Sequence, residues 1–334
     1  MKILLLTSIA FLLLIAANCI QNPSSATDAR ENASNAPTAT PIPDLQLQKQ
    51  INEIAKAANG TVGVHAIVIE TGQTVSLNES RHFAMQSVVK VPISMAVLKK
   101  VEEGKLKLDE KISVTKEDFV PANMHSPLRD ANPNGFEMTA RELIRQAISE
   151  SDGTASDVLQ RIAGGAKGVQ DHIGLLGVKG LNVELTHKEF SGKWDLQHTN
   201  WLTPAAGVEI LRKLYKGDGI SKENRELLLK FMTESSNPPN RILAGLPKGT
   251  VVAHKTGSGA TENGINSATN DIGIITMPNG NHIAIAILVG DAKAELPVRE
   301  SVIAQITKTI FDTWALGKAA PVEAANFNEK HSLN

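Results

Sequence analysis

Ser87 and Lys90 stand three positions apart, in the run Ser87-Val88-Val89-Lys90. Side chains at this spacing share one face of a helix. Pro92 has no N–H for the carbonyl four residues back, so we expect this helix to begin near Val88. Ser87 would then lie in or beside the first turn, where free N–H groups and the helix dipole stabilise an anion. A neutral Lys90 would accept the serine proton, whereas a charged one would stabilise negative charge, and both options remain open.

Two more short motifs follow in order along the chain. Residues 151–153 read Ser-Asp-Gly just before a predicted helix, and residues 255–257 read Lys-Thr-Gly at the end of an apolar strand, followed by Ser258. A lysine among small residues at a strand end can hold a carboxylate and leaves room for a flat substrate along the strand edge. The ordered set of three motifs is far more specific than any one of them, and it favours catalysis by a serine nucleophile.

With these motifs, the chain resembles the class A serine β-lactamases, in particular their extended-spectrum branch. The resemblance covers roughly residues 46–316. The stretches that carry it are Met85-Gln86-Ser87-Val88-Val89-Lys90, Gln197-His198-Thr199-Asn200-Trp201, Gly245-Leu246-Pro247-Lys248-Gly249-Thr250-Val251-Val252-Ala253-His254-Lys255-Thr256-Gly257 and Thr269-Asn270-Asp271-Ile272-Gly273. It implies a two-lobed fold and hydrolysis of penicillins and cephalosporins through an acyl-enzyme, which confers β-lactam resistance.

The resemblance also implies a role for each matching residue in acylation. Ser87 would be acylated by the β-lactam carbonyl, and Lys90 would help to remove its proton. Ser151 would pass that proton toward the ring nitrogen. The N–H groups of Ser87 and Ser258 would form the oxyanion hole.

A second set of residues is implied for substrate binding. Lys255, Thr256 and Ser258 would hold the substrate carboxylate. Arg241 matches the branch of the family that adds an arginine on this side, although a surface charge is the alternative interpretation. His125 falls where the family places an aromatic residue at the pocket mouth.

The chain departs from the family at two positions. Gly153 replaces the usual asparagine of the middle motif, which removes an amide that would orient the substrate. An ungapped alignment puts His187 where the family has the glutamate that activates the deacylating water, with Glu184 and Glu189 nearby. His187 could be the base near neutral pH, Glu189 could reach the site if the loop shifts by two residues, or no base is in place and the acyl-enzyme persists.

The elements that must position these residues alternate in type along the chain. Helical spacing over 44–58 and 295–316 and strand patterns over 61–77 and 250–289 predict an α/β protein of the α+β type, in which an antiparallel sheet is flanked by the terminal helices and carries an inserted all-helical lobe. Thr139 with Glu142, Thr203 before Pro204, and Ser221 predict starts of helices in that lobe. The predicted catalytic domain is 44–318, with an α/β lobe from 44–86 and 246–318 and a helical lobe at about 87–245.

The chain ends predict an exported protein. Lys2 and the apolar run 3–17 indicate a signal peptide in 1–20, followed by a flexible tether over 21–43, with a loose tail at 319–334. Cys19 offers a site for lipid attachment, but Asn18 stands where such sites carry a small residue. We expect the periplasm or the extracellular space, with no stable membrane span.

Composition narrows the classes of function and of partner. The 334 residues are 42% hydrophobic with a formal net charge of −1, and only 4% are aromatic. This excludes an extended basic surface for nucleic acid. With Cys19 as the sole cysteine, no disulfide or thiolate metal site is expected. We expect a monomer that takes a small β-lactam substrate and uses no metal or cofactor.

Three competing functions remain. A penicillin-binding DD-peptidase-like enzyme or slow acyl-trap fits the missing glutamate. A β-lactam sensor domain would need a transmembrane relay and a cytoplasmic partner segment, for which the sequence shows no pattern. A serine-dependent glutaminase would not need the Lys-Thr-Gly at the strand end.

Overall fold

The computed structural model describes residues 42–236 and 239–316 of the chain. The predicted signal peptide with Cys19, almost all of the tether and the tail at 319–334 lie outside the described residues. Among the helices of the described ranges, none has the length and apolar character needed to cross a membrane.

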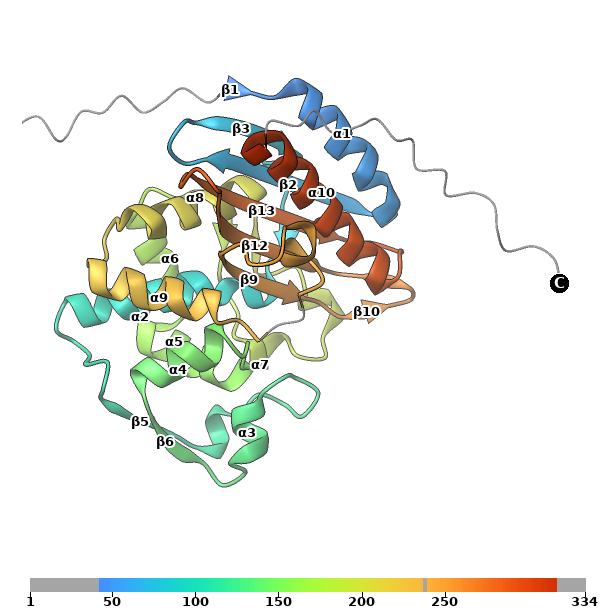
Figure 1. Cartoon of the computed structure of the whole chain (residues 1–334). Helices are drawn as coiled ribbons and strands as arrows, with labels where there is room; N and C mark the ends of the chain where they lie inside the picture. Colours follow the sequence, from blue (N-terminus) through green and yellow to red (C-terminus); the bar gives the residue numbers. More distant parts are fainter. Residues whose placement is uncertain (1–41, 237–238, 317–334) are drawn as a thin grey trace, which may run out of the picture. The chain divides into compact units, whose positions relative to one another are not determined.

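Strands from both ends of the described chain build one sheet in the order β1-β3-β2-β13-β12-β9 (Figure 1). The strands are β1 (Ile42–Pro43), β2 (Thr61–Val68), β3 (Gln73–Leu77), β9 (Val252–Ser258), β12 (Thr269–Thr276) and β13 (His282–Gly290). Only the short β1 runs parallel to its neighbour, and the other pairs are antiparallel. Pairing of β2 with β13 joins the two ends of the chain, so the predicted antiparallel sheet is confirmed.

One face of the sheet is covered by the two terminal helices, α1 (Leu45–Ala55) and α10 (Leu296–Leu316), which pack against each other (Figure 1). Asp44 begins α1 by accepting a hydrogen bond from the Leu47 N–H at 3.0 Å. Leu47 and Ile51, spaced for one helix face, are buried in the core on this side.

Helices cover the other face and fill the segment between β3 and β9. Helix α8 (Pro204–Lys216) packs directly on β13 and β2. The remaining helices are α2 (Lys90–Glu102), α3 (Pro127–Ala131), α4 (Ala140–Ile148), α5 (Gly153–Ala163), α6 (Gly165–Leu175), α7 (His187–Phe190) and α9 (Lys222–Thr233). The predicted fold class, a sheet flanked by terminal helices with an all-helical insertion, is therefore confirmed.

The predicted helix starts are found, with one change. Thr203 and Ser221 cap α8 and α9 through their side chains. Thr139 caps α4 by accepting from the N–H of Glu142, but the Glu142 carboxylate binds Arg145 at 2.7 Å instead of completing a capping box. The Glu142 carboxylate binds the charged guanidinium of Arg145 more strongly than it would bind the Thr139 backbone N–H.

Three small sheets were not predicted. They are the three-stranded β4 (Phe83–Ala84), β8 (Trp201–Leu202) and β7 (Leu181–Asn182), the hairpin β5 (Lys111–Val114) with β6 (Phe136–Thr139), and the pair β10 (Thr261–Glu262) with β11 (Ile265–Asn266). The strands are too short for a hydrophobic period to reveal them. The first of these sheets ties the segment before Ser87 to the segment that carries His187.

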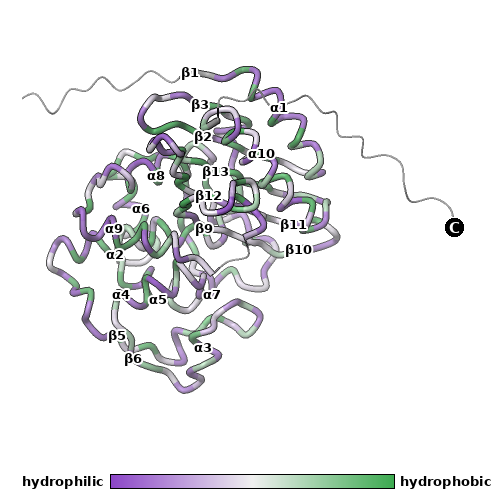
Figure 2. Tube along the Cα trace, in the orientation of Figure 1, coloured by the Kyte–Doolittle hydropathy of each residue, from purple (hydrophilic) through white to green (hydrophobic). Residues whose placement is uncertain are grey.

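Strand β9 lies at the edge of the large sheet, paired with β12 on one side only. The central strands are largely hydrophobic, as Figure 2 shows, and β13 is buried over nearly its whole length. At Gly257, a Cβ atom would come within 3.0 Å of the Met85 carbonyl oxygen. Glycine therefore lets the end of β9 approach the backbone that leads to Ser87.

Candidate active site

Ser87 lies in a short 3-10 turn, Gln86–Val89, that leads directly into α2. The turn begins two residues before the predicted start near Val88, and the α-helix itself begins at Lys90. Gln86 adopts a φ of 49°, in the left-handed region that non-glycine residues seldom occupy. A strained residue beside the candidate nucleophile is typical of a catalytic turn.

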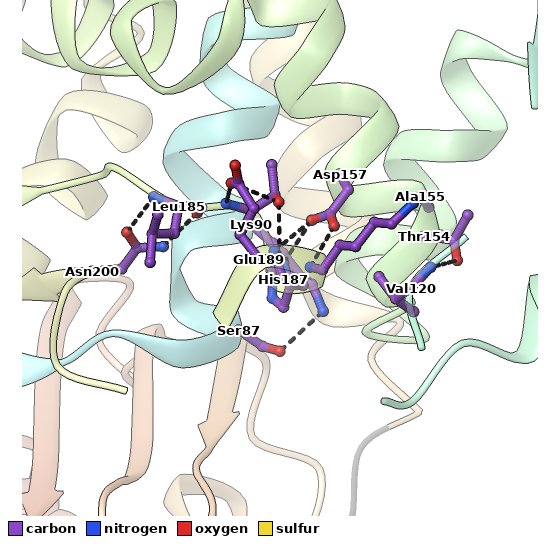
Figure 3. Close-up of polar contacts among 12 residues, drawn as sticks. Ser87, Lys90, Val120, Thr154, Ala155, Asp157, Leu185, His187, Glu189 and Asn200 are labelled. Carbon is purple, nitrogen blue, oxygen red and sulfur yellow. Dashed lines mark hydrogen bonds and ion pairs between the residues drawn. The ribbon is translucent and has the colours of Figure 1, made fainter. Parts of the chain in front are cut away.

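Lys90 joins the first two motifs. Its Nζ donates to the Ser87 Oγ at 2.9 Å (Figure 3) and to the Ser151 carbonyl at 2.7 Å, and it lies 3.2 Å from the Ser151 Oγ. The side chain is buried, and burial lowers the pKa of Lys90 to about 8, although Asp152 and Asp157 oppose the shift. The amine is therefore neutral in a substantial fraction of molecules near pH 8 and can accept a proton.

The Ser151 backbone is held by its neighbour Asp152. Ser151 has a φ of 56°, and the buried Asp152 carboxylate accepts from the Ser126 Oγ, the Leu128 N–H and the Ala155 N–H. The last contact caps α5. Asp152 therefore fixes the turn that points the Ser151 hydroxyl at Lys90. Asp152 was not assigned a role from the sequence, although an aspartate before a predicted helix is itself a capping signal.

The end of β9 brings in the third motif. The Lys255 Nζ donates to the Ser151 Oγ at 3.0 Å, so that hydroxyl lies between two lysines. Lys255 is fully buried, and burial, followed by repulsion from Lys90, lowers its pKa well below the usual value. Thr256 is buried beside it, whereas Ser258 is exposed. An anion placed here would be attracted by both amines.

The N–H of Ser258 faces the free edge of β9. Gly259 donates to the Ala268 carbonyl at 2.8 Å, while Ser258 is opposite Thr269 in the ladder. Because hydrogen-bonded and non-hydrogen-bonded pairs alternate along an antiparallel ladder, the backbone groups of Ser258 point away from β12. This is the orientation that an oxyanion-hole donor needs.

Arg241 lies beside Ser258 and is buried. One guanidinium nitrogen donates to the Ser258 Oγ at 2.7 Å and another to the Gly257 carbonyl at 3.0 Å. Its Nε pairs with Glu300 on α10 at 3.2 Å. The arginine is thus next to the end of β9 that carries Ser258, and it is not a surface charge. Glu300 was not singled out from the sequence.

His125 is exposed at the start of the segment that leads to α3. Its Nε2 lies 2.9 Å from the Glu150 carbonyl oxygen, and its own carbonyl accepts from the Gly153 N–H at 3.0 Å. A Cβ atom on Gly153 would lie 3.1 Å from that same carbonyl oxygen. The glycine that replaces the family's asparagine therefore allows the His125 segment to pack close to the Ser151 turn.

The three candidates for a deacylation base lie in different surroundings. His187 is buried at the start of α7, whereas Glu184 and Glu189 are exposed. The Glu189 carboxylate accepts from the Thr186 N–H at 2.7 Å and caps its own helix (Figure 3). Of these three side chains, His187 is the one that is buried, within electrostatic range of Lys90 and Lys255.

A buried aspartate binds His187. The Asp157 Oδ1 lies 3.1 Å from the His187 Nδ1 and accepts from the His187 N–H at 2.8 Å, and its Oδ2 accepts from the Lys188 N–H at 2.8 Å (Figure 3). Burial, followed by the charge of Lys90, lowers the pKa of His187, against the opposing effect of Asp157. Asp157 could not be identified from the sequence, because only the packing of α5 on α7 brings it next to His187.

The arrangement brings a serine, two amines and a guanidinium to one end of β9, as an acyl-transfer enzyme for an anionic substrate requires. Residues 46–314 match the family model described as the β-lactamase enzyme family. Among similar proteins, β-lactamase VEB-1 of Pseudomonas aeruginosa is 35% identical over 270 residues, which are 80% of this chain and 89% of the relative. Extended-spectrum β-lactamase PER-1 of Pseudomonas aeruginosa is 33% identical over 266 residues, 79% of this chain and 86% of the relative.

Solved structures give the same result. A β-lactamase from Chitinophaga pinensis DSM 2588 superposes with a TM-score of 0.78 at 40% identity, over 80% of this chain and 98% of that one. TLA-3 extended-spectrum β-lactamase has a TM-score of 0.77 at 42% identity, over 80% and 97% of the two chains. Because the family model matches residues 46–314, most of this chain, the chain belongs to the class A β-lactamases, the serine hydrolases that open β-lactam rings and confer resistance to these antibiotics.

Proposed function

We propose that Ser87 is the residue acylated by the β-lactam, and that Lys90 and Ser151 move its proton. The observation that carries this proposal is the position of the Lys90 Nζ, 2.9 Å from the Ser87 Oγ and 3.2 Å from the Ser151 Oγ. A single amine that reaches both hydroxyls can take a proton at one and return it at the other.

Acylation then proceeds in two balanced steps. Ser87 gives its proton to the neutral Lys90 while its Oγ bonds to the β-lactam carbonyl carbon, and the N–H groups of Ser87 and Ser258 stabilise the oxyanion. The C–N bond of the ring breaks as the ring nitrogen takes the Ser151 hydroxyl proton, which Lys90 replaces. The product is an ester on Ser87 with both amine and hydroxyl restored.

The substrate carboxylate is assigned to the end of β9, where Lys255, Thr256, Ser258 and Arg241 meet. Support comes from the charges around Lys255. Lys90 and Arg241 both lower the pKa of Lys255, in addition to burial. A bound carboxylate would offset this repulsion and favour the charged lysine. His125, whose side chain is exposed, is assigned a contact with the substrate at the pocket mouth.

One experiment tests this mechanism. Purified protein is mixed with a chromogenic cephalosporin, and absorbance and intact mass are followed together. Steady colour release with an adduct that maps to Ser87 is expected. A single burst with a lasting adduct would instead favour the slow acyl-trap or DD-peptidase-like alternative. That alternative is consistent with His187 in place of the family's glutamate.

We also propose an exported monomer with a catalytic domain over 44–318, divided into lobes as the sequence predicts. The charged start and apolar run of 1–20 support export. Exposed large apolar side chains of the described residues are few, at Leu45, Leu175, Val251, Leu296 and Val298, which supports a monomer. Cell fractionation with the mass of the mature chain, and light scattering of the purified protein, test these two points.

A further inference from the structure

The Asp157 carboxylate determines which nitrogen of His187 carries the proton. Asp157 already accepts two backbone N–H groups, from His187 and Lys188, each at 2.8 Å. A carboxylate in this position acts as an acceptor, so the 3.1 Å contact with the His187 Nδ1 requires a proton on Nδ1. The neutral ring then presents the lone pair of Nε2.

That Nε2 atom is buried and has no hydrogen-bond partner within 42–236 and 239–316. The His187 side chain as a whole is 3% exposed. A buried acceptor that lacks a partner costs stability unless a water or a ligand binds it. The Nδ1 of His187 thus contacts Asp157, and the Nε2 can accept a hydrogen bond from a small polar molecule.

Charged groups from three other elements act on this ring. They are Asp157 on α5, Lys90 on α2 and Lys255 on β9. The ring of Phe190, on the same helix as His187, lies 5.3 Å away between centroids. The amines of Lys90 and Lys255 contact Ser87 and Ser151. The imidazole therefore lies within electrostatic range of the groups that bind these two hydroxyls.

We infer that Asp157 and His187 form the deacylation base of this enzyme, with His187 as the catalytic residue and Asp157 as its positioning residue. This inference rests on the acyl-enzyme at Ser87 proposed above. The His187 Nε2 takes a proton from a water molecule while the water oxygen bonds to the ester carbonyl carbon. The tetrahedral intermediate then breaks its bond to the Ser87 Oγ, which recovers the proton from His187 as the carboxylic acid leaves.

The pair replaces a single glutamate by two residues with divided tasks. Both oxygens of an ionised glutamate can accept a proton. A neutral histidine works as a base only if the nitrogen that faces the water is the unprotonated one. Burial and Lys90 hold the pKa of His187 below its usual value, so the ring is neutral at neutral pH. Deacylation should therefore lose rate only as the pH falls below the ordinary histidine range.

Two substitutions test the pair, with acylation and deacylation measured separately. His187→Gln removes the base and keeps a polar side chain. Asp157→Asn leaves one acceptor oxygen where the carboxylate has two. If that oxygen stays on the His187 N–H and Nδ1, the amide NH2 faces the Lys188 N–H, and if it turns, the NH2 faces the His187 N–H and Nδ1. In either orientation the negative charge that holds the Nδ1 proton is lost. Both should leave the burst of acylation intact and slow the decay of the acyl-enzyme by about 10²–10⁴-fold. His187→Gln should remove the acid limb of the pH profile, whereas Asp157→Asn should move it to lower pH, because Asp157 raises the pKa of His187.

Glu189→Gln is the matched comparison, because glutamine can still accept from the Thr186 N–H. The inference is overturned if Glu189→Gln traps the acyl-enzyme while His187→Gln deacylates normally. A normal burst with unchanged decay in both His187→Gln and Asp157→Asn would also overturn it and would leave acylation at Ser87 standing. No adduct at all on the parent enzyme would overturn the acyl-enzyme and this inference together.

A measurement on the parent protein does not depend on the folding of any variant. Nitrogen-15 NMR of labelled histidine, assigned with the His187→Gln spectrum or by through-bond correlation, reports which ring nitrogen is protonated. A protonated Nδ1 and an unprotonated Nε2 at neutral pH are expected. A protonated Nε2 would overturn the inference.

Discussion

The Lys255 Nζ lies 3.0 Å from the Ser151 Oγ, although 104 positions separate these residues in the chain. Lys90 reaches the same hydroxyl from the opposite motif at 3.2 Å. Ser151 is therefore the point at which the sheet edge and the helical segment meet. A hydroxyl between two buried amines is well placed to exchange a proton with either of them.

Ser87→Ala should abolish the covalent adduct with a penicillin and leave the fold unchanged, because the substitution removes only a partly exposed hydroxyl. Intact mass and circular dichroism check the two statements. Ser94→Ala is the matched control, since Ser94 lies on α2 and its Oγ has no partner among the described residues. A lasting adduct in Ser87→Ala would show that another residue is acylated.

The pH dependence of acylation should distinguish the two roles of Lys90. If the neutral amine takes the Ser87 proton, the rate constant of acylation rises as the pH approaches 8 and levels off above it, because burial brings the pKa of Lys90 to about 8. Burst kinetics measured from about pH 6 to 10, across this pKa, provide the test. A rate that falls above pH 8 would mean that the charged amine is the active form.

Lys255→Ala should lower kcat/KM by about 10²–10³-fold, as expected for the loss of a charge-assisted contact in a dry site. The substitution also removes one of the two amines at the Ser151 Oγ. Comparison of a cephalosporin with its carboxylate ester separates the two effects. If both substrates lose the same factor, Lys255 does not bind the carboxylate.

Much of this site could be predicted from the sequence because its spacing is local. Ser87 and Lys90 share a helix turn, and the Lys-Thr-Gly motif ends a strand with a clear hydrophobic pattern. The terminal helices and the long strands are also identifiable, because each is long enough to show its hydrophobic periodicity.

The rest depends on tertiary contacts that a single sequence does not encode locally. Asp157 meets His187 across 30 positions, and Arg241 meets Glu300 across 59. Sequence alone also could not fix the loop before α7, where a shift of two residues exchanges His187 for Glu189. Packing determines that register, because Phe190 is buried and Thr186 caps α7 together with Glu189, which leaves Glu189 exposed to solvent.

Arg241→Ala should raise KM more than it lowers kcat, and it should also destabilise the fold. Loss of the guanidinium breaks the ion pair at 3.2 Å and leaves Glu300, with 12% of its side chain exposed, to the neutral amide of Asn240 at 3.3 Å. Breaking such a pair typically costs about 3 kcal/mol. Adding Glu300→Gln should recover part of the unfolding free energy without restoring KM. Denaturant unfolding and steady-state kinetics on both variants test this, and an unchanged KM for several substrates would remove Arg241 from the binding site.

The last prediction concerns the dependence of the deacylation base on Asp157. His187→Glu should accelerate decay of the acyl-enzyme if α7 keeps its position, because a carboxylate there needs no particular tautomer. In that background Asp157→Asn should have little effect, since the asparagine oxygen can still accept the backbone N–H of residue 187, now held at 2.8 Å by Asp157. In the parent, the same Asp157→Asn change should slow decay by about 10²-fold or more.

The four proteins of this double-mutant cycle share one measurement, the decay of the acyl-enzyme followed by mass after rapid mixing. A large coupling between positions 157 and 187 means that Asp157 acts through the imidazole. If Asp157→Asn slows decay equally in both backgrounds, Asp157 only holds the backbone of α7 in place, through the His187 and Lys188 N–H groups. Should His187→Glu deacylate more slowly than the parent while Glu189→Gln is trapped, the loop shifts by two residues in solution and Glu189 is the base.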